Sequence, residues 1–389
     1  MQVVYVIRKS VLKSFSFFNP LEIIKSGRAL PVGTIREWKG KKYKKITPQK
    51  WVEVKEKSKH GDLIPADSFN ANNYKEKFTD KKCTNDKEGI AHVYSLLGAG
   101  GAETEAAVEK KLNEQNRRLK NGDTRIRNMH NVKFDEDGKF VSGEWNEDRD
   151  ALHAEIMSKI LTPEVIQACK PKNGAKPKFV MFGGRGGSGK SWFTDKNLAA
   201  ENGRKVMFEG IKAGVKRDSK GNVISMKQDF DVNANNFLIL DADEIKSAFT
   251  EYKGWNAAEV HEESSYLMKE IKKAAMKNGL NIIIDGTMNY NPEKPNKVRN
   301  EILEAKENGY STEAHYMFTP IQKSCVNAMN RFKTKNGDFS GRLVPTNILL
   351  GMQDNEKSFD SIKDVVDDWT FRDNQNFEAK LISRKGLKI

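Results

Sequence analysis

The chain has 389 residues, of which 37% are hydrophobic and 31% charged, and its formal net charge at pH 7 is +14. This length allows about two or three domains and at least one sizeable hydrophobic core. No stretch approaches the roughly 18 apolar residues that would span a bilayer. Basic residues also interrupt segment 1–18, unlike the continuous apolar core of a signal peptide. We therefore expect a cytoplasmic protein with no membrane partner.

The three cysteines, Cys83, Cys169 and Cys325, are too far apart in the sequence to suggest a metal site or a disulfide framework. The positive charge favours polyanionic or phosphorylated partners, because a positive field attracts them over long range. A nucleotide and a nucleic acid are both partners of this kind. Lysines spread over a solvated surface explain the charge equally well.

Residues 1–60 are expected to form a small basic module. Segment 32–54 within it predicts a hairpin that turns at Lys39-Gly40. The apolar and aromatic residues on the two sides of that turn are Ile35, Trp38, Tyr43, Ile46 and Trp51. Lysines beside tryptophans could bind single-stranded nucleic acid by base stacking. The alternative, which we favour, is that the aromatic residues form the core of a module that has little else to bury.

Residues 61–145 are expected to form a polar, partly helical connector. The pattern predicts a helix over 103–120, which Asn121-Gly122 would end. A hairpin over 132–145 is predicted to turn at Asp137-Gly138. No set of residues in 1–145 suggests catalysis.

A phosphate-binding loop follows a short apolar run at 179–182. The sequence GRGGSGKS over 184–191 fits the Walker A pattern G-x-x-x-x-G-K-[ST] without a mismatch. Its glycines allow consecutive backbone N–H groups to turn towards phosphate oxygens at the N-terminus of the next helix. The residues expected to contact the nucleotide are Gly184, Gly186, Gly187, Ser188, Gly189, Lys190, Ser191 and Trp192.

Two residues of this loop have the side chains that the chemistry needs. Lys190 would place a positive charge between the β- and γ-phosphates, and the Ser191 hydroxyl would bind Mg²⁺. A helix is predicted after the loop, ending at Asn202-Gly203. The alternative is a glycine-rich surface turn, which this context disfavours.

Strand and helix patterns alternate through residues 146–389. Strands are predicted at 179–182, 205–208, 237–240, 281–285 and 313–318, and helices at 257–277, 292–308 and 321–332. Segment 209–236 is polar and predicts a hairpin insertion with a turn at 219–222. This alternation predicts an α/β fold of the P-loop NTPase type, a three-layer kinase domain with a central parallel sheet.

In an open parallel sheet, ligands bind beyond the carboxyl ends of the strands. Asp241 and Asp243 directly follow the strand predicted at 237–240, and Asp285 and Thr287 lie at the end of the next one. Two carboxylates at this spacing can divide the work, Asp241 assisting Mg²⁺ and Asp243 accepting a proton from an attacking hydroxyl. The alternative for this pair is a helix N-cap.

Phosphoryl transfer spreads negative charge over the moving group, which arginines stabilise. Arg331 lies near the end of the helix predicted at 321–332, and Arg342 follows a polar, glycine-containing segment suited to a lid at 333–341. Exposed surface arginine is the alternative for each.

The order of these motifs resembles the zeta toxin family of kinases. That family has a phosphate loop, an acidic D-x-D strand end, a helix rich in Glu and Ser, a strand ending in [DE]-G-T and a late arginine pair. The corresponding segments here are GGRGGSGKS, LDADEIK, VHEESSYLMKEI, IIIDGTM and RFKTKNGDFSGRLVP. The resemblance covers residues 146–389 and leaves the first 145 unexplained.

This resemblance implies an ATP- or GTP-dependent, Mg²⁺-dependent kinase of a hydroxyl of UDP-N-acetylglucosamine, with an antitoxin as a possible partner. By the same resemblance, Asp243 is the general base, and Arg331 and Arg342 stabilise the transition state. The acceptor would be held by Asp285, Thr287 and Glu263. The chain has Asp-Gly-Thr where the family has Glu-Gly-Thr, and the insertion at 209–236 is a further departure, so the acceptor sugar is open.

Two other functions remain open at this point. The phosphate loop, the D-x-D pair, the arginines and the +14 charge also suit a polynucleotide 5′-hydroxyl kinase. A nucleotide-binding module is the other possibility, with the nucleotide ordering a phage-type assembly and the basic N-terminal region docking on nucleic acid or a phage structural protein. Steep salt dependence of binding would favour the nucleic-acid functions.

Overall fold

The computed structural model describes residues 35–38, 41–47, 50–54, 63–78, 83, 87–96, 101–190, 209–333, 339, 341–376 and 378–388. The chain divides into two compact units, Met1–Asp62 and Leu63–Ile389. Ser191, Trp192, the helix predicted after them and the strand predicted at 205–208 lie outside the described residues.

The first unit contains a three-stranded antiparallel sheet, β1 (Ile35–Trp38), β2 (Lys41–Thr47) and β3 (Lys50–Val54). Trp38 pairs with Lys41, which confirms the hairpin predicted around Lys39-Gly40. Thr47 pairs with Lys50 and begins a second hairpin. The sequence pattern placed Ile46 and Trp51 in one strand, and the structure separates them into two.

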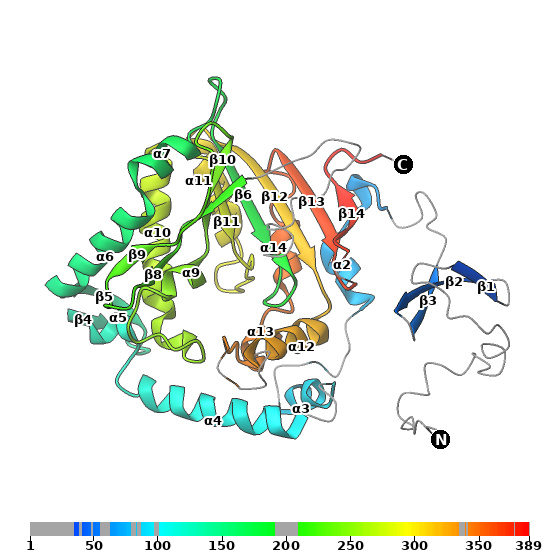
Figure 1. Ribbon diagram of the computed structural model, residues 1–389, viewed down its shortest axis with the longest axis horizontal. Coiled ribbons are helices and arrows are strands. Elements are labelled where there is room, and N and C mark those ends of the chain that lie inside the picture. Colours follow the sequence, from blue (N-terminus) through cyan, green and yellow to red (C-terminus); the bar gives the residue numbers. More distant parts are fainter. Residues whose placement is uncertain are drawn as a thin grey trace, which may run out of the picture. The chain divides into compact units, whose positions relative to one another are not determined.

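A seven-stranded sheet organises the second unit (Figure 1). Its strands are β6 (Lys178–Gly183), β7 (Glu209–Lys212), β10 (Asn236–Leu240), β11 (Ile282–Asp285), β12 (Ser311–Phe318), β13 (Asp368–Asp373) and β14 (Lys380–Arg384). Their order is β14-β13-β12-β6-β11-β10-β7. Every neighbouring pair is parallel except β13 with β14. The predicted α/β fold with a mostly parallel central sheet is confirmed.

Helices and two small hairpins connect and flank these strands. The helices are α2 (Ala71–Glu76), α3 (Lys87–Leu96), α4 (Gly101–Leu119), α5 (Thr124–Arg127), α6 (Glu147–Ile160), α7 (Pro163–Cys169), α9 (Ala242–Lys246), α10 (His261–Lys277), α11 (Lys297–Glu307), α12 (Ile321–Phe332), α13 (Thr346–Leu350) and α14 (Asn355–Asp360), with 3₁₀ turns η2 (Ala66–Ser68) and η4 (Ala257–Val260). The hairpins are β4 (Met129–Phe134) with β5 (Phe140–Trp145), and β8 (Val215–Arg217) with β9 (Val223–Ser225). Among the described helices, none has the length and apolarity that crossing a membrane requires.

The core forms because the central strands are apolar on both faces, as expected for a parallel sheet. Phe179 and Met181 of β6 belong to the largest hydrophobic cluster, together with residues of α6, α10 and α11. Val180 and Phe182 of the same strand belong to a cluster on the opposite face, with Phe237 of β10. Alternation along β6 therefore separates two cores and fixes the register of the strand.

Residues 63–145, expected to form a connector, pack within the same compact unit as the sheet. The Phe69 ring lies 5.9 Å from the Trp369 ring, and Tyr74 lies 5.4 Å from Phe371, measured between centroids. The N-terminus of α2 donates backbone hydrogen bonds to the Asp360 carboxylate at 3.0 Å. A few apolar side chains in this polar segment are enough to attach it to the main core.

Segment 209–236 differs in part from the predicted insertion. The hairpin is confirmed, because β8 and β9 pair on either side of the turn near Gly221. Its first residues instead form β7, which pairs with β10 at the edge of the central sheet. Only four residues make this strand, too few for a clear periodic signal.

Candidate active site

The phosphate loop starts where β6 ends, between the parallel neighbours β11 and β12. Gly184, Gly187 and Gly189 have φ values of 135°, 85° and 89°. A Cβ at Gly184 would lie 2.4 Å from the Met317 carbonyl oxygen, and one at Gly187 would lie 2.5 Å from that of Ser324. The backbone conformation and the close neighbours both require glycine here.

Side chains from two other elements hold the loop. The Asn327 amide on α12 donates to the Gly187 carbonyl at 2.9 Å. The Asn374 amide, directly after β13, donates to the Ser188 carbonyl at 2.7 Å. The backbone N–H groups of Gly186, Gly187 and Gly189 donate to no atom of a described residue. Consecutive backbone donors of this kind fit phosphate oxygens.

Arg185 occupies a variable position of the Walker pattern, and it is a structural residue. It is 1% exposed, and its guanidinium lies 2.6 Å from the buried Glu356 carboxylate. It also donates to the carbonyls of Thr319 and Gln353 at 3.2 Å, and Tyr316 donates to the second Glu356 oxygen at 2.9 Å. These contacts connect the phosphate loop to α14.

Lys190 lies over the loop that precedes it. Its Nζ donates to the Gly184 carbonyl at 2.6 Å and to the Arg185 carbonyl at 3.2 Å. Burial lowers the pKa of this amine, and the nearby carboxylates of Asp285 and Asp241 oppose the change. The lysine and the two acidic strand ends are therefore close enough to interact.

Asp241 and Asp243 have different surroundings, although they are two residues apart. Asp241 caps α9 and accepts a hydrogen bond from the Asp243 backbone N–H at 2.9 Å, so the N-cap alternative holds for this residue. Burial, together with the charges of Asp243 and Asp285, raises the pKa of Asp241 to about 7. A nearby cation would favour its ionised form.

Asp243 carries two cationic partners. Its Oδ1 lies 2.8 Å from Nζ of Lys246, which is almost fully buried, and its Oδ2 is ion-paired with Arg342. Burial alone would raise the pKa of Asp243, but Lys246 and Arg342 outweigh it, and the net pKa is lowered. Asp243 is therefore ionised at neutral pH.

Both predicted arginines lie near Asp241 and Asp243. Arg342 contacts Asp243 directly. Arg331 is the penultimate residue of α12. Loss of hydration, together with the like charge of Arg342, lowers its pKa, while Asp243 and Asp241 oppose this change. The structure thus brings Lys190, Asp241, Asp243, Asp285, Arg331 and Arg342 to one edge of the sheet.

The three residues expected to hold an acceptor are placed differently. Asp285 ends β11 half-buried, on the same side as Lys190. The Thr287 carbonyl accepts from the Gly184 N–H at 3.3 Å and from the Asn355 amide at 2.9 Å, so its backbone supports the loop.

Glu263 does not reach the open site. It is 0% exposed, and its carboxylate is occupied by Arg149, at 2.5 and 2.8 Å, and by His153 at 2.7 Å. Those partners come from α6, and they correct the expectation that Glu263 faces an acceptor. Its sequence position on the Glu- and Ser-rich helix gave no sign of this burial.

A magnesium ion would find few protein ligands here. Within the described ranges, no group of three or more His, Cys, Asp or Glu side chains could hold a metal. Of the two residues expected from the sequence to bind Mg²⁺, Asp241 is described and Ser191 lies outside those ranges. Few protein ligands suit Mg²⁺, which commonly binds through one or two carboxylates and the phosphates of a nucleotide.

Sequence reasoning missed several residues that shape this site: Arg185, Lys246, Asn327, Asn374 and Glu356. Asn374 follows a strand that the sequence pattern did not predict, so its position at the sheet edge had no signal. Lys246 is three residues after Asp243 on α9, and this helical spacing could have indicated their contact.

Part of the sequence matches a known family. The family model described as Zeta toxin matches residues 218–381. Comparison with curated proteins gives no match.

Solved structures give weaker similarities. The crystal structure of AvrRxo1-ORF1:AvrRxo1-ORF2 with sulphate ions has a TM-score of 0.40 and 17% identity, over 59% of this chain and 65% of that chain. The complex of the same pair with ATP has a TM-score of 0.39 and 16% identity, over 59% and 64%. A structure from the PezAT chromosomal toxin-antitoxin system of Streptococcus pneumoniae has a TM-score of 0.39 and 13% identity, over 62% and 83%. The first two matches span less than two thirds of the AvrRxo1 chains.

Proposed function

Residues 218–381 belong to a zeta toxin domain, and on this premise we propose that the protein is a nucleotide- and Mg²⁺-dependent kinase. It would transfer a phosphoryl group to a hydroxyl of a small-molecule acceptor, namely a nucleotide sugar such as UDP-N-acetylglucosamine. The nucleotide would be ATP or GTP.

One observation carries the proposal. A glycine loop whose backbone donors have no acceptor among the described residues lies near an ionised Asp243 and the cation of Arg342, at the carboxyl edge of a parallel sheet. Phosphoryl transfer needs donors for the phosphates, an acceptor for the hydroxyl proton and positive charge for the transition state. All three are present at one edge.

Asp243 would accept the proton of the acceptor hydroxyl. Its contacts with Lys246 and Arg342 keep it deprotonated at neutral pH, as a base must be. Arg342 would need to leave this ion pair in order to contact the transferred group. The contact with Lys246, which lies within the same helix, would persist and hold the carboxylate in place.

The nucleotide would bind through the loop amides and Lys190, with Arg331 and Arg342 facing its terminal phosphate. Asp241 and Ser191 are the residues that would hold Mg²⁺, which neutralises phosphate charge when bound. Asp285, half-buried beside Lys190, is the acidic residue best placed for an acceptor hydroxyl. The choice of a UDP-sugar rests on the family resemblance.

The proposal is tested by incubating the full chain with γ-labelled ATP or GTP, Mg²⁺ and a panel of acceptors. The panel contains UDP-sugars, the free sugars and 5′-hydroxyl oligonucleotides, and the Asp243→Asn variant is the matched control. Label should pass to a UDP-sugar with the parent protein and at a much reduced rate with the variant. Transfer to oligonucleotides alone, or no transfer to any hydroxyl, would contradict it.

A further inference from the structure

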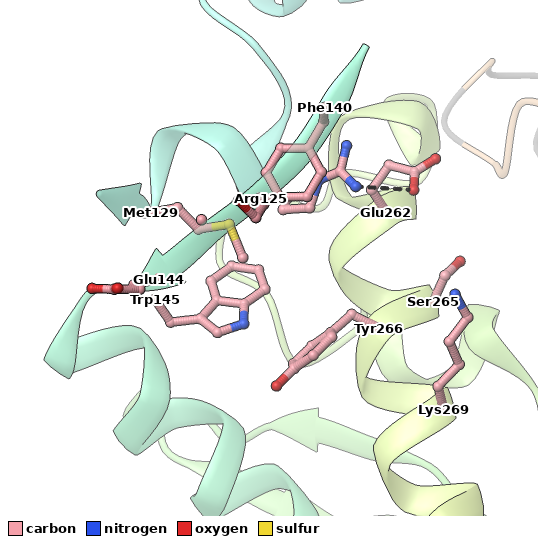
Figure 2. Close-up of a pocket in the computed structure, with 11 residues that line it drawn as sticks. Arg125, Met129, Phe140, Glu144, Trp145, Glu262, Ser265, Tyr266 and Lys269 are labelled. Carbon is pink, nitrogen blue, oxygen red and sulfur yellow. Dashed lines mark ion pairs between the residues drawn. The ribbon is translucent and has the colours of Figure 1, made fainter. Parts of the chain in front are cut away.

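A pocket lies between the β4–β5 hairpin and α10 (Figure 2). Its volume is about 360 Å³, within the usual range for small-molecule sites. None of its lining residues belongs to the phosphate loop or to the acidic and arginine cluster described above. The hairpin side of the pocket also lies outside the segment matched by the zeta toxin model, 218–381.

Large flat side chains make up its apolar walls. Trp145 comes from β5 and Tyr266 from α10, and their ring centroids are 5.2 Å apart with planes at 47° (Figure 2). The His153 ring packs edge-on against Trp145, with ring centroids 4.5 Å apart, and this contact restricts the position of the indole. Phe140 and Met129 line the same cavity. Half-buried aromatic faces at a cavity wall suit a planar ring.

Most of the charged groups around the pocket already have partners. Arg125 lies 3.9 Å over the Phe140 ring and is ion-paired with Glu262 at 3.6 Å. Glu144 lies 2.9 Å from His130. Lys269 is exposed, and its side chain has no ion pair or hydrogen bond with any residue that the structure describes.

Helix periodicity places Lys269 beside the aromatic wall. Ser265 and Tyr266 each lie three or four residues from both Glu262 and Lys269, so the four residues lie along one side of α10. In Figure 2 the Ser265 hydroxyl and the Lys269 ammonium lie on the helix side of the pocket. The pocket thus offers a stacking surface and, next to it, one cation with a neighbouring hydroxyl.

We infer that this pocket is a ligand site separate from the phosphate loop, and that it binds a planar heteroaromatic ring carrying an anionic group, as in a nucleoside monophosphate. The ring would lie against Trp145 and Tyr266, and the anionic group would meet Lys269 and Ser265. This inference is independent of phosphoryl transfer, because no residue of the site takes part in that chemistry.

Binding is tested on the full chain carrying Lys190→Ala, so that the phosphate loop contributes less to nucleotide affinity. Equilibrium dialysis with labelled UMP and AMP should give saturable binding. Adding Trp145→Ala should weaken it by about tenfold or more, the usual effect of losing a stacking partner. Adding Lys269→Gln should weaken monophosphate binding by about fivefold and leave uridine or adenosine binding unchanged.

Two neighbouring residues provide controls. Val141→Ala changes an exposed residue of the same strand, and Lys273→Gln removes a cation one turn further along α10, and neither lines the pocket. Both should bind as the Lys190→Ala background does. Thermal melting shows whether Trp145→Ala still folds, and Lys269→Gln tests the site without touching its packing. No saturable binding, equal losses for nucleoside and monophosphate, or preferential binding of choline would overturn the inference.

Discussion

Two arginine–carboxylate pairs lie at the same edge of the sheet, and their burial gives them opposite roles. Arg185 and Glu356 are almost completely buried, and each makes further hydrogen bonds within the protein. Arg342 and Asp243 keep 35% and 24% of their side-chain surface exposed. The first pair has no surface left for a ligand and acts on the shape of the loop. The second can exchange partners, as a catalytic pair must.

The difference between the two pairs should be largest when Arg342, the more exposed arginine, is replaced. Arg342→Ala should lower turnover by about 10³- to 10⁵-fold, the usual effect of losing an arginine that stabilises a transferred phosphoryl group. Because a half-exposed ion pair contributes little stability, the melting temperature should stay near that of the parent. Steady-state kinetics and a melting curve on one preparation measure both. A stable variant with parental turnover would remove Arg342 from the mechanism.

Replacing Asp243 and replacing Asp241 should also have different effects. Asp243→Asn keeps the size of the side chain and removes the proton acceptor, so transfer should fall by about 10²- to 10⁴-fold with little change in nucleotide affinity. Asp241→Asn should instead weaken the Mg²⁺ dependence of nucleotide binding. Titrations of nucleotide with and without Mg²⁺, beside transfer rates, distinguish the two. Transfer at the parental rate by Asp243→Asn would exclude it as the base.

The buried pair should respond to mutation mainly through stability. Arg185→Ala leaves Glu356 charged and buried, which should cost about 3–5 kcal/mol of unfolding free energy in a urea titration. The double variant Arg185→Met, Glu356→Gln should lose less than the two single changes added together, because neither charge is left alone. A loss below about 1 kcal/mol for Arg185→Ala would mean that the network does not hold the loop.

Glu263 should show its structural role in acid. Its hydrogen bond with His153 and its ion pair with Arg149 overcome the effect of burial and lower its pKa to about 2, against an ordinary 4.5. A carboxylate of this kind stabilises the fold above about pH 4.5, and the contribution disappears as the pH falls towards 2. It amounts to about 3 kcal/mol.

Unfolding free energies measured between pH 6 and 2.5 test this. Glu263→Gln should show a shallower fall over that interval than the parent protein. Glu313, whose pKa is also lowered to about 2, remains in the variant, so the unfolding free energy should still decrease as the pH falls. An unchanged slope would show that Glu263 is not ion-paired in solution.

Patterns that depend on neighbours in the sequence predicted the central fold well. β6, β10 and β11 are continuous apolar runs bounded by glycine, asparagine or aspartate, and such runs mark buried parallel strands. β13 and β14 were not predicted, because DWTFRD and KLISR mix charged and apolar residues. They are the two strands at that end of the sheet, and each is too short for its pattern to stand out: β13 buries only Trp369 and Phe371 between polar residues.

The same distinction applies to the residues of the candidate site. The phosphate loop, Asp241, Asp243, Asp285 and the arginines could be proposed as site residues because the chemistry fixes their residue types and the strand ends fix their positions. The burial of Glu263 and the role of Arg185 could not be predicted, because they depend on α6 and α14, which lie far away in the sequence. Sequence identifies a charged residue, but only the fold decides whether another charge has already neutralised it.

The most direct test of the account is turnover by Lys190→Ala. The amine donates to the carbonyls of Gly184 and Arg185, near the carboxylates of Asp285 and Asp241, and it lies at the edge of the sheet, so its loss should leave the fold intact. The account predicts a melting temperature close to that of the parent and no measurable nucleotide-dependent phosphoryl transfer. Parental turnover in that folded variant would contradict the assignment of residues 184–191 as the phosphate-binding loop of a kinase.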